Sequence, residues 1–476
     1  MGTKRAGQKQ EELFYASERA EAPGHPFYQR LNAVLNKAGF DGFCEERCRR
    51  FYHRKLGRPS LAPGVYFRLL LIGFFEGIAS ERGIGWRVAD SFSLRRFLKY
   101  GLGEATPDHV TISRTRRLLD EATHQAVFTF VLAEVARRGM LKGKTIGIDA
   151  TTLEANAAMR SIVRRDTGES YEEFLRGLAK ASGIETPTRE DLARLDRKRK
   201  KRTSNKEWKS PADGDARIAK MKDGRTHLAH KAEHAVDLDT GAVVAVTLQG
   251  ADQGDTTTLD ETLCKAGMAV AEQVGREAEL RPHEAPKVNV AGIKEAVTDK
   301  GYHSGAVVKR MKAYGVRSYI PEKKPKGRRK WAGKAEEQQA VYANRRRVRS
   351  EYGKSLLRRR GELVERSFAH CYETGGTRRC HLRGQENILK RQLVHVGAFN
   401  LSLILRKLLG AGTPREWKNR FGRFVLTLYL LFKCRINQKR PCRSQISASV
   451  AQCFVRSRTR LRRPTCRESA TCTPGC

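Results

Sequence analysis

The spacing of apolar residues predicts that the first part of the chain is helical. Over residues 25–140, apolar positions recur at three- and four-residue intervals in FYQRLNAVLNKAGF, FRLLLIGFFEGI, GWRVADSFSLRRFLKY and HQAVFTFVLAEVARRG. Thr106–Pro107 has the form of a helix start, and Gly77 suits a helix end. We therefore predict an all-α domain over residues 25–140, preceded by a polar, flexible arm over residues 1–24. The arginines among its helices suggest a DNA-binding domain, and an ordinary helical bundle with a solvated basic face is the alternative.

At Lys144 the pattern changes from helical to extended. In TIGIDATTL, Ile146 and Ile148 alternate with smaller or polar positions that include Asp149, and β-branched residues are frequent. Both features are typical of a strand. HLAHKAEHAVDLD and GAVVAVTLQ follow, joined by DTG at residues 239–241, and predict a β-hairpin.

The chain then alternates helical and extended patterns. A helix is predicted over residues 256–274, followed by the short strand EAVTD, which ends at Asp299. The next elements are the helix SGAVVKRMKAYG, ended by Gly315, and the strand VRSYIPEK. A long helix is expected from about Asn344, with Glu365 at the border of its apolar stripe, and a last one over residues 386–409.

This order of elements predicts a mixed α/β fold, in which helices flank a mixed sheet. We assign residues 141–410 to this second domain, with a basic insertion near residues 190–215 that contains RKRKKR. Phosphate contact is favoured for that run over a solvated linker. Residues 411–476 form a basic, cysteine-rich tail that we expect to be partly disordered, with FVLTLYLLF as its one buried element.

The charge of the chain points to a polyanionic partner. Its 476 residues include 93 Lys and Arg against 52 Asp and Glu, a formal net charge of +41, which favours nucleic acid. The longest apolar stretch, Phe67–Phe75, is interrupted by Arg68 and is too short to cross a bilayer. We expect a cytoplasmic, nucleoid-associated protein with no membrane contact and reduced cysteines. Cys44 and Cys48 could form half of a zinc site, but we favour the interpretation that they are simply two helical positions one turn apart.

Three carboxylates stand out against this basic background. They are Asp149 in the first strand, Asp299 at the end of a later strand, and Glu365 on the long helix. Phosphodiester cleavage needs charge neutralised at the phosphorus and a stabilised leaving oxygen, which two divalent ions provide. Because Mg²⁺ takes oxygen ligands and keeps several waters, a few carboxylates on rigid elements suffice to hold it.

At these motifs the sequence resembles a known family. IGIDATTLEAN, VTDKGYHS, GELVERSFAH and LRGQENILKRQLVHVGAFNLSLILR are similar, in order and spacing, to blocks of DDE transposases from bacterial insertion sequences. The block GRPSLAPGVYFRLLLIGFFEGIASERGIGWRVADSFSLRRFL resembles their helical N-terminal domain. The resemblance implies an RNase H-like catalytic domain, with Asp149, Asp299 and Glu365 as ligands of two Mg²⁺ or Mn²⁺ ions.

The third ligand departs from the family pattern. Gly361 stands four residues before Glu365 where related transposases have an arginine, and Tyr372 stands seven after it where they have a lysine. Glu362 lies on the same helical face and is the alternative. Glu365 is preferred because VERSF is the better match and brings Phe368 into the core. Residues predicted to contact DNA are Lys300, Tyr302, Arg360, Arg383 and Lys390. Packing within the turn is the alternative for Tyr302, and a solvated helix face is the alternative for Arg383 and Lys390.

The resulting hypothesis is an enzyme that binds the terminal inverted repeats of its insertion sequence, cleaves DNA at the element ends and joins the 3′-OH strand to target DNA. Its expected partners are double-stranded DNA and a second copy of the chain, with no small-molecule cofactor. One alternative is a catalytically inactive DNA-binding remnant of a transposase. Another is an RNase H-like nuclease that cuts without strand transfer.

Overall fold

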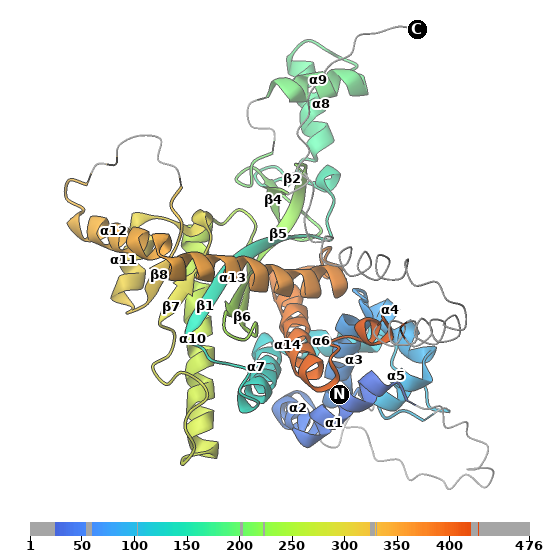
Figure 1. Ribbon diagram of the computed structural model, residues 1–476. Helices are drawn as coiled ribbons and strands as arrows, with labels where there is room; N and C mark the ends of the chain where they lie inside the picture. Colours follow the sequence, from blue (N-terminus) through green and yellow to red (C-terminus); the bar gives the residue numbers. More distant parts are fainter. Residues whose placement is uncertain are drawn as a thin grey trace, which may run out of the picture. The chain divides into compact units, whose positions relative to one another are not determined.

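Helices make up the N-terminal part of the protein, as the apolar spacing predicts. The computed structural model describes residues 24–53, 60–101, 103–199, 203–221, 224–323, 329, 331–419 and 427. The first helices are α1 (Pro26–Lys37), α2 (Phe40–Cys48), α3 (Pro63–Glu76), α4 (Glu81–Ala89), α5 (Phe92–Phe97), α6 (His109–Leu118) and α7 (Glu121–Arg137) (Figure 1). Gly77 ends α3 with a φ of 70°, a left-handed conformation that glycine adopts without steric cost.

Local chemistry explains how these helices begin and pack. Asp108 caps α6 and Asp120 caps α7, each accepting a hydrogen bond from a backbone N–H of the first turn. The Arg68 side chain of α3 is 1% exposed, and its Nε donates to Asp41 Oδ1 at 2.7 Å. Cys44 and Cys48 are both buried on α2, in agreement with the prediction that they are two helical positions one turn apart.

A six-stranded mixed sheet forms the second part of the fold. Its strands are β1 (Thr145–Glu154), β4 (Arg217–Lys220), β5 (Thr226–Asp237), β6 (Val243–Gly250), β7 (Glu295–Val297) and β8 (Arg317–Tyr319). The order is β4-β5-β1-β7-β8, with β6 also paired to β5. β1 is antiparallel to β5 and parallel to β7, so the predicted mixed sheet is confirmed, including the β5–β6 hairpin.

Two long helices cover opposite faces of this sheet. They are α10 (Asp255–Leu280) and α13 (Glu351–Phe368). His234 of β5 contacts Ser367 of α13, whereas its neighbour Glu233 contacts Thr258 of α10. Because successive strand residues point to opposite faces, these contacts place α13 on one face and α10 on the other. Figure 1 shows α13 lying across β1 and β5.

The helix α14 (Gln385–Leu409) joins the N-terminal helices to the sheet. It packs against α7, α3 and β6, and every residue from Ile388 to Leu405 is buried. One hydrophobic core therefore runs from α1 through α14 to the sheet. The predicted domain boundary near residue 140 falls between α7 and β1, and the division into two domains stays a prediction.

The insertion between β1 and β4 is larger than the predicted basic segment. It contains β2 (Val163–Arg164), β3 (Trp208–Lys209), α8 (Tyr171–Ala181) and α9 (Arg189–Lys198). Trp208 is fully buried and packs with Ile162, Ala155 and other apolar residues in a small core of its own. Residues 200–202 of the RKRKKR run lie outside the described residues, so its contact with phosphate stays a prediction.

The region predicted as one long helix from Asn344 contains two helices, so that prediction was wrong. They are α12 (Ala335–Arg349) and α13, separated at Ser350. Ser350 has extended backbone angles, and its hydroxyl accepts a hydrogen bond from Gly353 N at 3.0 Å. Serine offers this cap more readily than it continues a helix, which explains the break. The helix α11 (Gly305–Ala313) packs on α12.

Of the predicted tail, only residues 411–419 and 427 are described, so FVLTLYLLF lies outside the described residues apart from Thr427. Among the described helices, the segment Gln385–Asn419 is long and apolar enough to span a membrane. Its apolar window is 72% buried within the protein, as in the core helix of a globular fold. The bent pair α3 and α4 passes the same test only if its 92° bend is ignored.

Candidate active site

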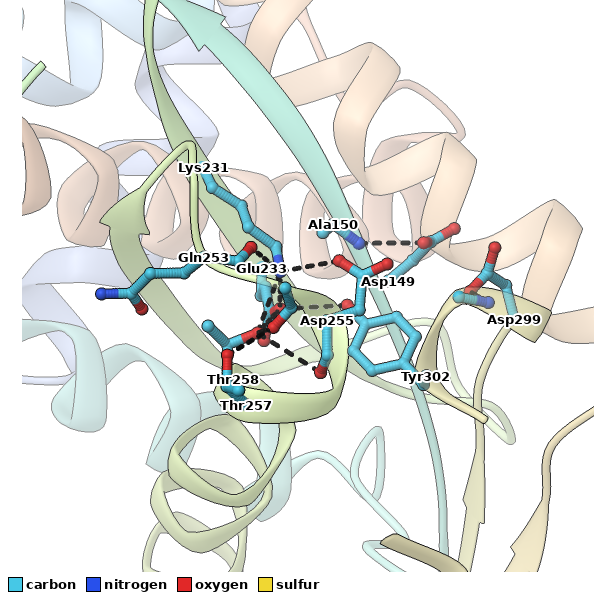
Figure 2. Close-up of polar contacts among 12 residues, drawn as sticks. Asp149, Ala150, Lys231, Glu233, Gln253, Asp255, Thr257, Thr258, Asp299 and Tyr302 are labelled. Carbon is cyan, nitrogen blue, oxygen red and sulfur yellow. Dashed lines mark hydrogen bonds and ion pairs between the residues drawn. The ribbon is translucent and has the colours of Figure 1, made fainter. Parts of the chain in front are cut away.

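Asp149, in the middle of β1, lies near Asp299, which follows the end of the neighbouring parallel strand β7. The pairing of β1 with β7 runs from Thr145 opposite Glu295 to Gly147 opposite Val297. Continuing this register by two residues brings Asp149 level with Asp299. Figure 2 shows the two side chains close together beside β1. The sheet order thus brings together two residues that are remote in sequence.

The Asp149 carboxylate lies in a crowded acidic environment. Burial raises its pKa to about 6, and the neighbouring carboxylates of Asp299 and Glu365 add to this increase. The Arg360 guanidinium and the Ala150 N–H act in the opposite direction, with Arg360 Nη1 2.5 Å from Asp149 Oδ2. Asp299 and Glu365 are therefore both close enough to Asp149 to influence its ionisation.

Asp299 is held by the turn that follows it. Its Oδ1 accepts a hydrogen bond of 2.6 Å from Gly301 N at the start of the 3-10 helix η4 (Lys300–Tyr302). A Cβ at position 301 would overlap Asp255 Oδ2 and lie 2.8 Å from Asp299 Oδ1. A larger residue at this position would therefore displace at least one of these two carboxylates. Asp255, at the first turn of α10, is thus a neighbour of Asp299.

Glu365 projects from the exposed side of α13 into a cavity of about 560 Å³. Phe368, Arg378 and Glu154 also line this cavity, whereas Asp149 and Asp299 do not. The alternative ligand Glu362 is exposed and pairs with Arg366 at 2.5 Å, one turn along the same helix. Its carboxylate therefore already has a cationic partner at the surface, which favours Glu365 as the third acid.

These residues have the donor chemistry of a magnesium site, because three carboxylates offer hard oxygen ligands. Within the described part of the chain, however, no three Asp, Glu, His or Cys side chains have their donor atoms arranged around one metal position. Arg360 engages Asp149, and the Gly301 N–H engages Asp299. Binding an ion to Asp149 would therefore require the Arg360 guanidinium to move away from it.

Two of the residues predicted to contact DNA lie on the surface. Lys300 is exposed directly after Asp299. Arg383 is exposed before α14, and its Nε donates to the backbone oxygen of Asn156 at 3.3 Å. Both side chains are accessible to a phosphate, and their contact with DNA stays a prediction.

The other three are engaged within the protein. Tyr302 is fully buried, and its hydroxyl donates to Glu233 at 3.1 Å. Lys390 is 3% exposed and pairs with Glu386 at 2.6 Å. Arg360 is bound to Asp149, as described above. In this structure, contact between these residues and DNA would require each side chain to leave its partner.

Sequence reasoning missed a buried polar network on the opposite side of β1. Lys231 and Glu233 of β5 are 5% and 0% exposed, and their charged groups are 3.0 Å apart. Lys231 also pairs with Asp255 at 2.7 Å (Figure 2). The signal in the sequence was a lysine and a glutamate on one face of the strand AHKAEHAV, which otherwise reads as buried.

Two family models match the chain on either side of the segment that carries Asp149 and Asp299, and one of them includes Glu365. A model described as a transposase domain (DUF772) matches residues 15–118, which include α1 to α6. A model described as a transposase DDE domain matches residues 321–405, which include α12, α13 with Glu365, and most of α14. Comparisons with curated proteins and with solved structures gave no match. The order of the two matches, with the mixed sheet between them, shows that the chain belongs to the DDE transposases of insertion sequences.

Proposed function

We propose that this transposase binds the terminal inverted repeats of its insertion sequence, cleaves DNA at the element ends and transfers the 3′-OH strand to target DNA. Asp149, Asp299 and Glu365 would hold two Mg²⁺ or Mn²⁺ ions. The enzyme would act in the cytoplasm on nucleoid DNA. A homodimer is proposed because two element ends must be brought together.

The observation that carries this proposal is the convergence of acids beside β1, at the point where its parallel neighbour β7 has ended. Asp149 and Asp299 lie at the same level of adjacent parallel strands, and the helix that bears Glu365 packs on β1. Polar side chains at the carboxyl ends of parallel strands are a common basis of active sites in α/β folds. Rigid strands and a packed helix also fix such groups more closely than loops do.

The protein's own side chains would contribute mainly by positioning the metal ions and the DNA. Bound divalent ions would supply charge neutralisation and activation of the attacking oxygen. The carboxylates would hold those ions, while Lys300 and Arg383 would contact phosphates beside the cleaved bond. Glu365, at the edge of its cavity, would leave room for a DNA strand to approach.

Recognition of the element ends is assigned to the N-terminal helices. On α6, Val110, Arg114 and Arg117 are exposed at helical spacing, so they form one accessible stripe. The buried Arg116 of the same helix donates to Glu81 Oε1 at 2.8 Å and to Asn387 Oδ1 at 2.5 Å. Arg116 thereby ties α6 to both α4 and α14, which would fix the stripe relative to the catalytic acids.

The test uses purified full-length protein, Mg²⁺ and a plasmid that carries the gene with its natural flanks. Cleavage at the element ends with joined products supports the proposal. Asp149→Asn should abolish cleavage and leave DNA binding largely intact, because it removes a negative charge without changing the basic surface. Unchanged cleavage by this variant would remove Asp149 from the mechanism.

One observation favours the alternative of an inactive DNA-binding remnant. The Arg360 guanidinium forms an ion pair with the Asp149 carboxylate. In addition, the acids in the described part of the chain do not surround one metal position. In the same assay, DNA binding without any cleavage would support that alternative. Cleavage without joined products would instead indicate an RNase H-like nuclease.

A further inference from the structure

A buried network surrounds the carboxylate of Glu233 beneath the candidate site. Glu233 is 0% exposed and accepts hydrogen bonds from Tyr302 Oη at 3.1 Å, from Thr262 Oγ1 at 2.6 Å and from Thr258 Oγ1. Lys231 Nζ lies 3.0 Å from the same carboxylate (Figure 2). Lys231 belongs to β5, both threonines belong to α10 and Tyr302 belongs to η4, so Glu233 joins these three elements.

Lys231 extends this network to the turn that holds Asp299. Its Nζ lies 2.7 Å from Asp255 Oδ1 and 5.9 Å from the centre of the Tyr302 ring. Asp255 in turn flanks Gly301, between Asp299 and Tyr302 in sequence. Gly301 and Tyr302 therefore lie against side chains of the network, whereas Lys300 between them and Asp299 is exposed.

The path of Tyr302 links the two strands that carry the aspartates. Glu233 pairs with Ala150, the residue after Asp149, and β1 separates β5 from β7 in the sheet. To reach Glu233, the Tyr302 side chain must therefore cross β1 on the face of the sheet that α10 covers. The hydroxyl consequently fixes the turn after Asp299 relative to the strand of Asp149.

The cost of this arrangement argues that it has a positional role. Taking an ammonium and a carboxylate out of water carries a desolvation penalty that packed apolar side chains of similar volume would avoid. Burial and the nearby Glu233 carboxylate raise the pKa of Tyr302 well above its ordinary value, so its hydroxyl stays a hydrogen-bond donor. A donor fixed in this way holds the turn in one position.

We propose that Tyr302 and Glu233 are positioning residues, which hold the Asp299 carboxylate in register with Asp149 through the Tyr302–Glu233 hydrogen bond. This inference rests on the proposed function, in which Asp299 holds a divalent ion. Neither residue would touch DNA or metal. Outer groups that orient a metal ligand typically change metal affinity by about 10–100-fold when they are removed.

The test compares Tyr302→Phe with Tyr319→Phe as a matched control. Tyr319 is also buried, and its hydroxyl donates to the buried Glu295 at the opposite end of β7, at 3.3 Å. Both variants lose one hydrogen bond from a tyrosine to a buried glutamate, but only the Tyr302 hydroxyl anchors the turn that follows Asp299. Two quantities are measured on the full chain: Mn²⁺ binding by calorimetry without DNA, and the Mn²⁺ concentration that gives half-maximal plasmid cleavage.

Tyr302→Phe should weaken Mn²⁺ binding and raise the half-maximal Mn²⁺ concentration by roughly tenfold, with cleavage restored at high Mn²⁺. Tyr319→Phe should leave both values unchanged. Equal behaviour of the two variants, whether unchanged or equally impaired, would overturn the proposal. If wild-type protein neither binds Mn²⁺ nor cleaves, the proposed function itself fails instead.

A second pair of variants gives the answer if Tyr302→Phe does not fold. Glu233→Gln keeps an oxygen that can accept the Tyr302 hydrogen bond, whereas Glu233→Ala removes it. The glutamine variant should bind Mn²⁺ several-fold more tightly than the alanine variant. Equal Mn²⁺ affinities would contradict the positional role of this hydrogen bond.

Discussion

A buried histidine between the sheet and α13, next to Asp149, makes the fold sensitive to acid. His234 of β5 is fully buried directly across from Asp149 on the neighbouring strand. Its Nδ1 lies 2.9 Å from Ser367 Oγ, and its Nε2 lies 2.8 Å from Tyr372 Oη. Ser367 Oγ donates to the backbone oxygen of Val364 and so accepts from the histidine. A neutral imidazole thus anchors the end of the helix that bears Glu365.

The loss of stability at low pH follows from the difference in His234 protonation between the folded and the unfolded chain. Burial lowers the pKa of folded His234 to about 3, against 6.5 for an exposed histidine. Below pH 6.5 the unfolded chain therefore binds a proton that the folded chain does not, so stability falls as pH falls. Between pH 7 and pH 5 this one residue should remove about 2 kcal/mol of stability.

His234→Gln isolates this contribution, because glutamine can hydrogen-bond to the same partners but does not titrate. Thermal unfolding is measured at pH 7 and pH 5, and the decrease in melting temperature should be smaller in the variant by a few degrees. The buried His124 and His395 contribute equally in both proteins and cancel in the comparison. His283, which is exposed, gives the control substitution. An identical pH-dependent decrease in wild type and His234→Gln would refute the reasoning.

Three further predictions test packing and the third acid. Gly353→Ala should destabilise the folded protein by about 2–3 kcal/mol, since the added Cβ would overlap the backbone oxygen of Arg347. Gly361→Ala in the same helix meets open space and should stabilise the folded protein by about 0.5–1 kcal/mol. Opposite shifts in melting temperature check this pair. Asn400→Leu should cost about 2–4 kcal/mol in urea unfolding, because the buried N–H and C=O of Val243 both bond to the Asn400 side chain. In the plasmid assay, Glu365→Gln should reduce cleavage by about 100-fold or more and Glu362→Gln by a few-fold at most, and the reverse order would assign the metal to Glu362.

Local patterns were enough to predict most elements and their type. The alternation around Asp149 predicted β1, the DTG turn predicted the hairpin of β5 and β6, and apolar spacing predicted α14, which ends at Gly410. These features depend on backbone preferences and on which face of an element meets water. Both are written in a few neighbouring residues.

Where local signals competed, the sequence was less informative. The run from Asn344 has helical composition on both sides of Ser350, so nothing in its periodicity marked the break that the Ser350 cap creates. The insertion read as a basic arm, because the burial of Trp208 depends on contacts with residues on either side of two helices. Such contacts leave no periodic pattern in the sequence.

The sequence by itself determined which acids are available and on what kind of element each one lies. Only the tertiary structure decided that β1 lies beside β7, which brings Asp149 level with Asp299. It likewise decided that Arg360 forms an ion pair with Asp149. It also decided that Tyr302 is buried against Glu233 instead of facing solvent. The physical reason is that strand order, burial and ion pairing are set by residues far apart in the chain, whose joint packing no local pattern encodes.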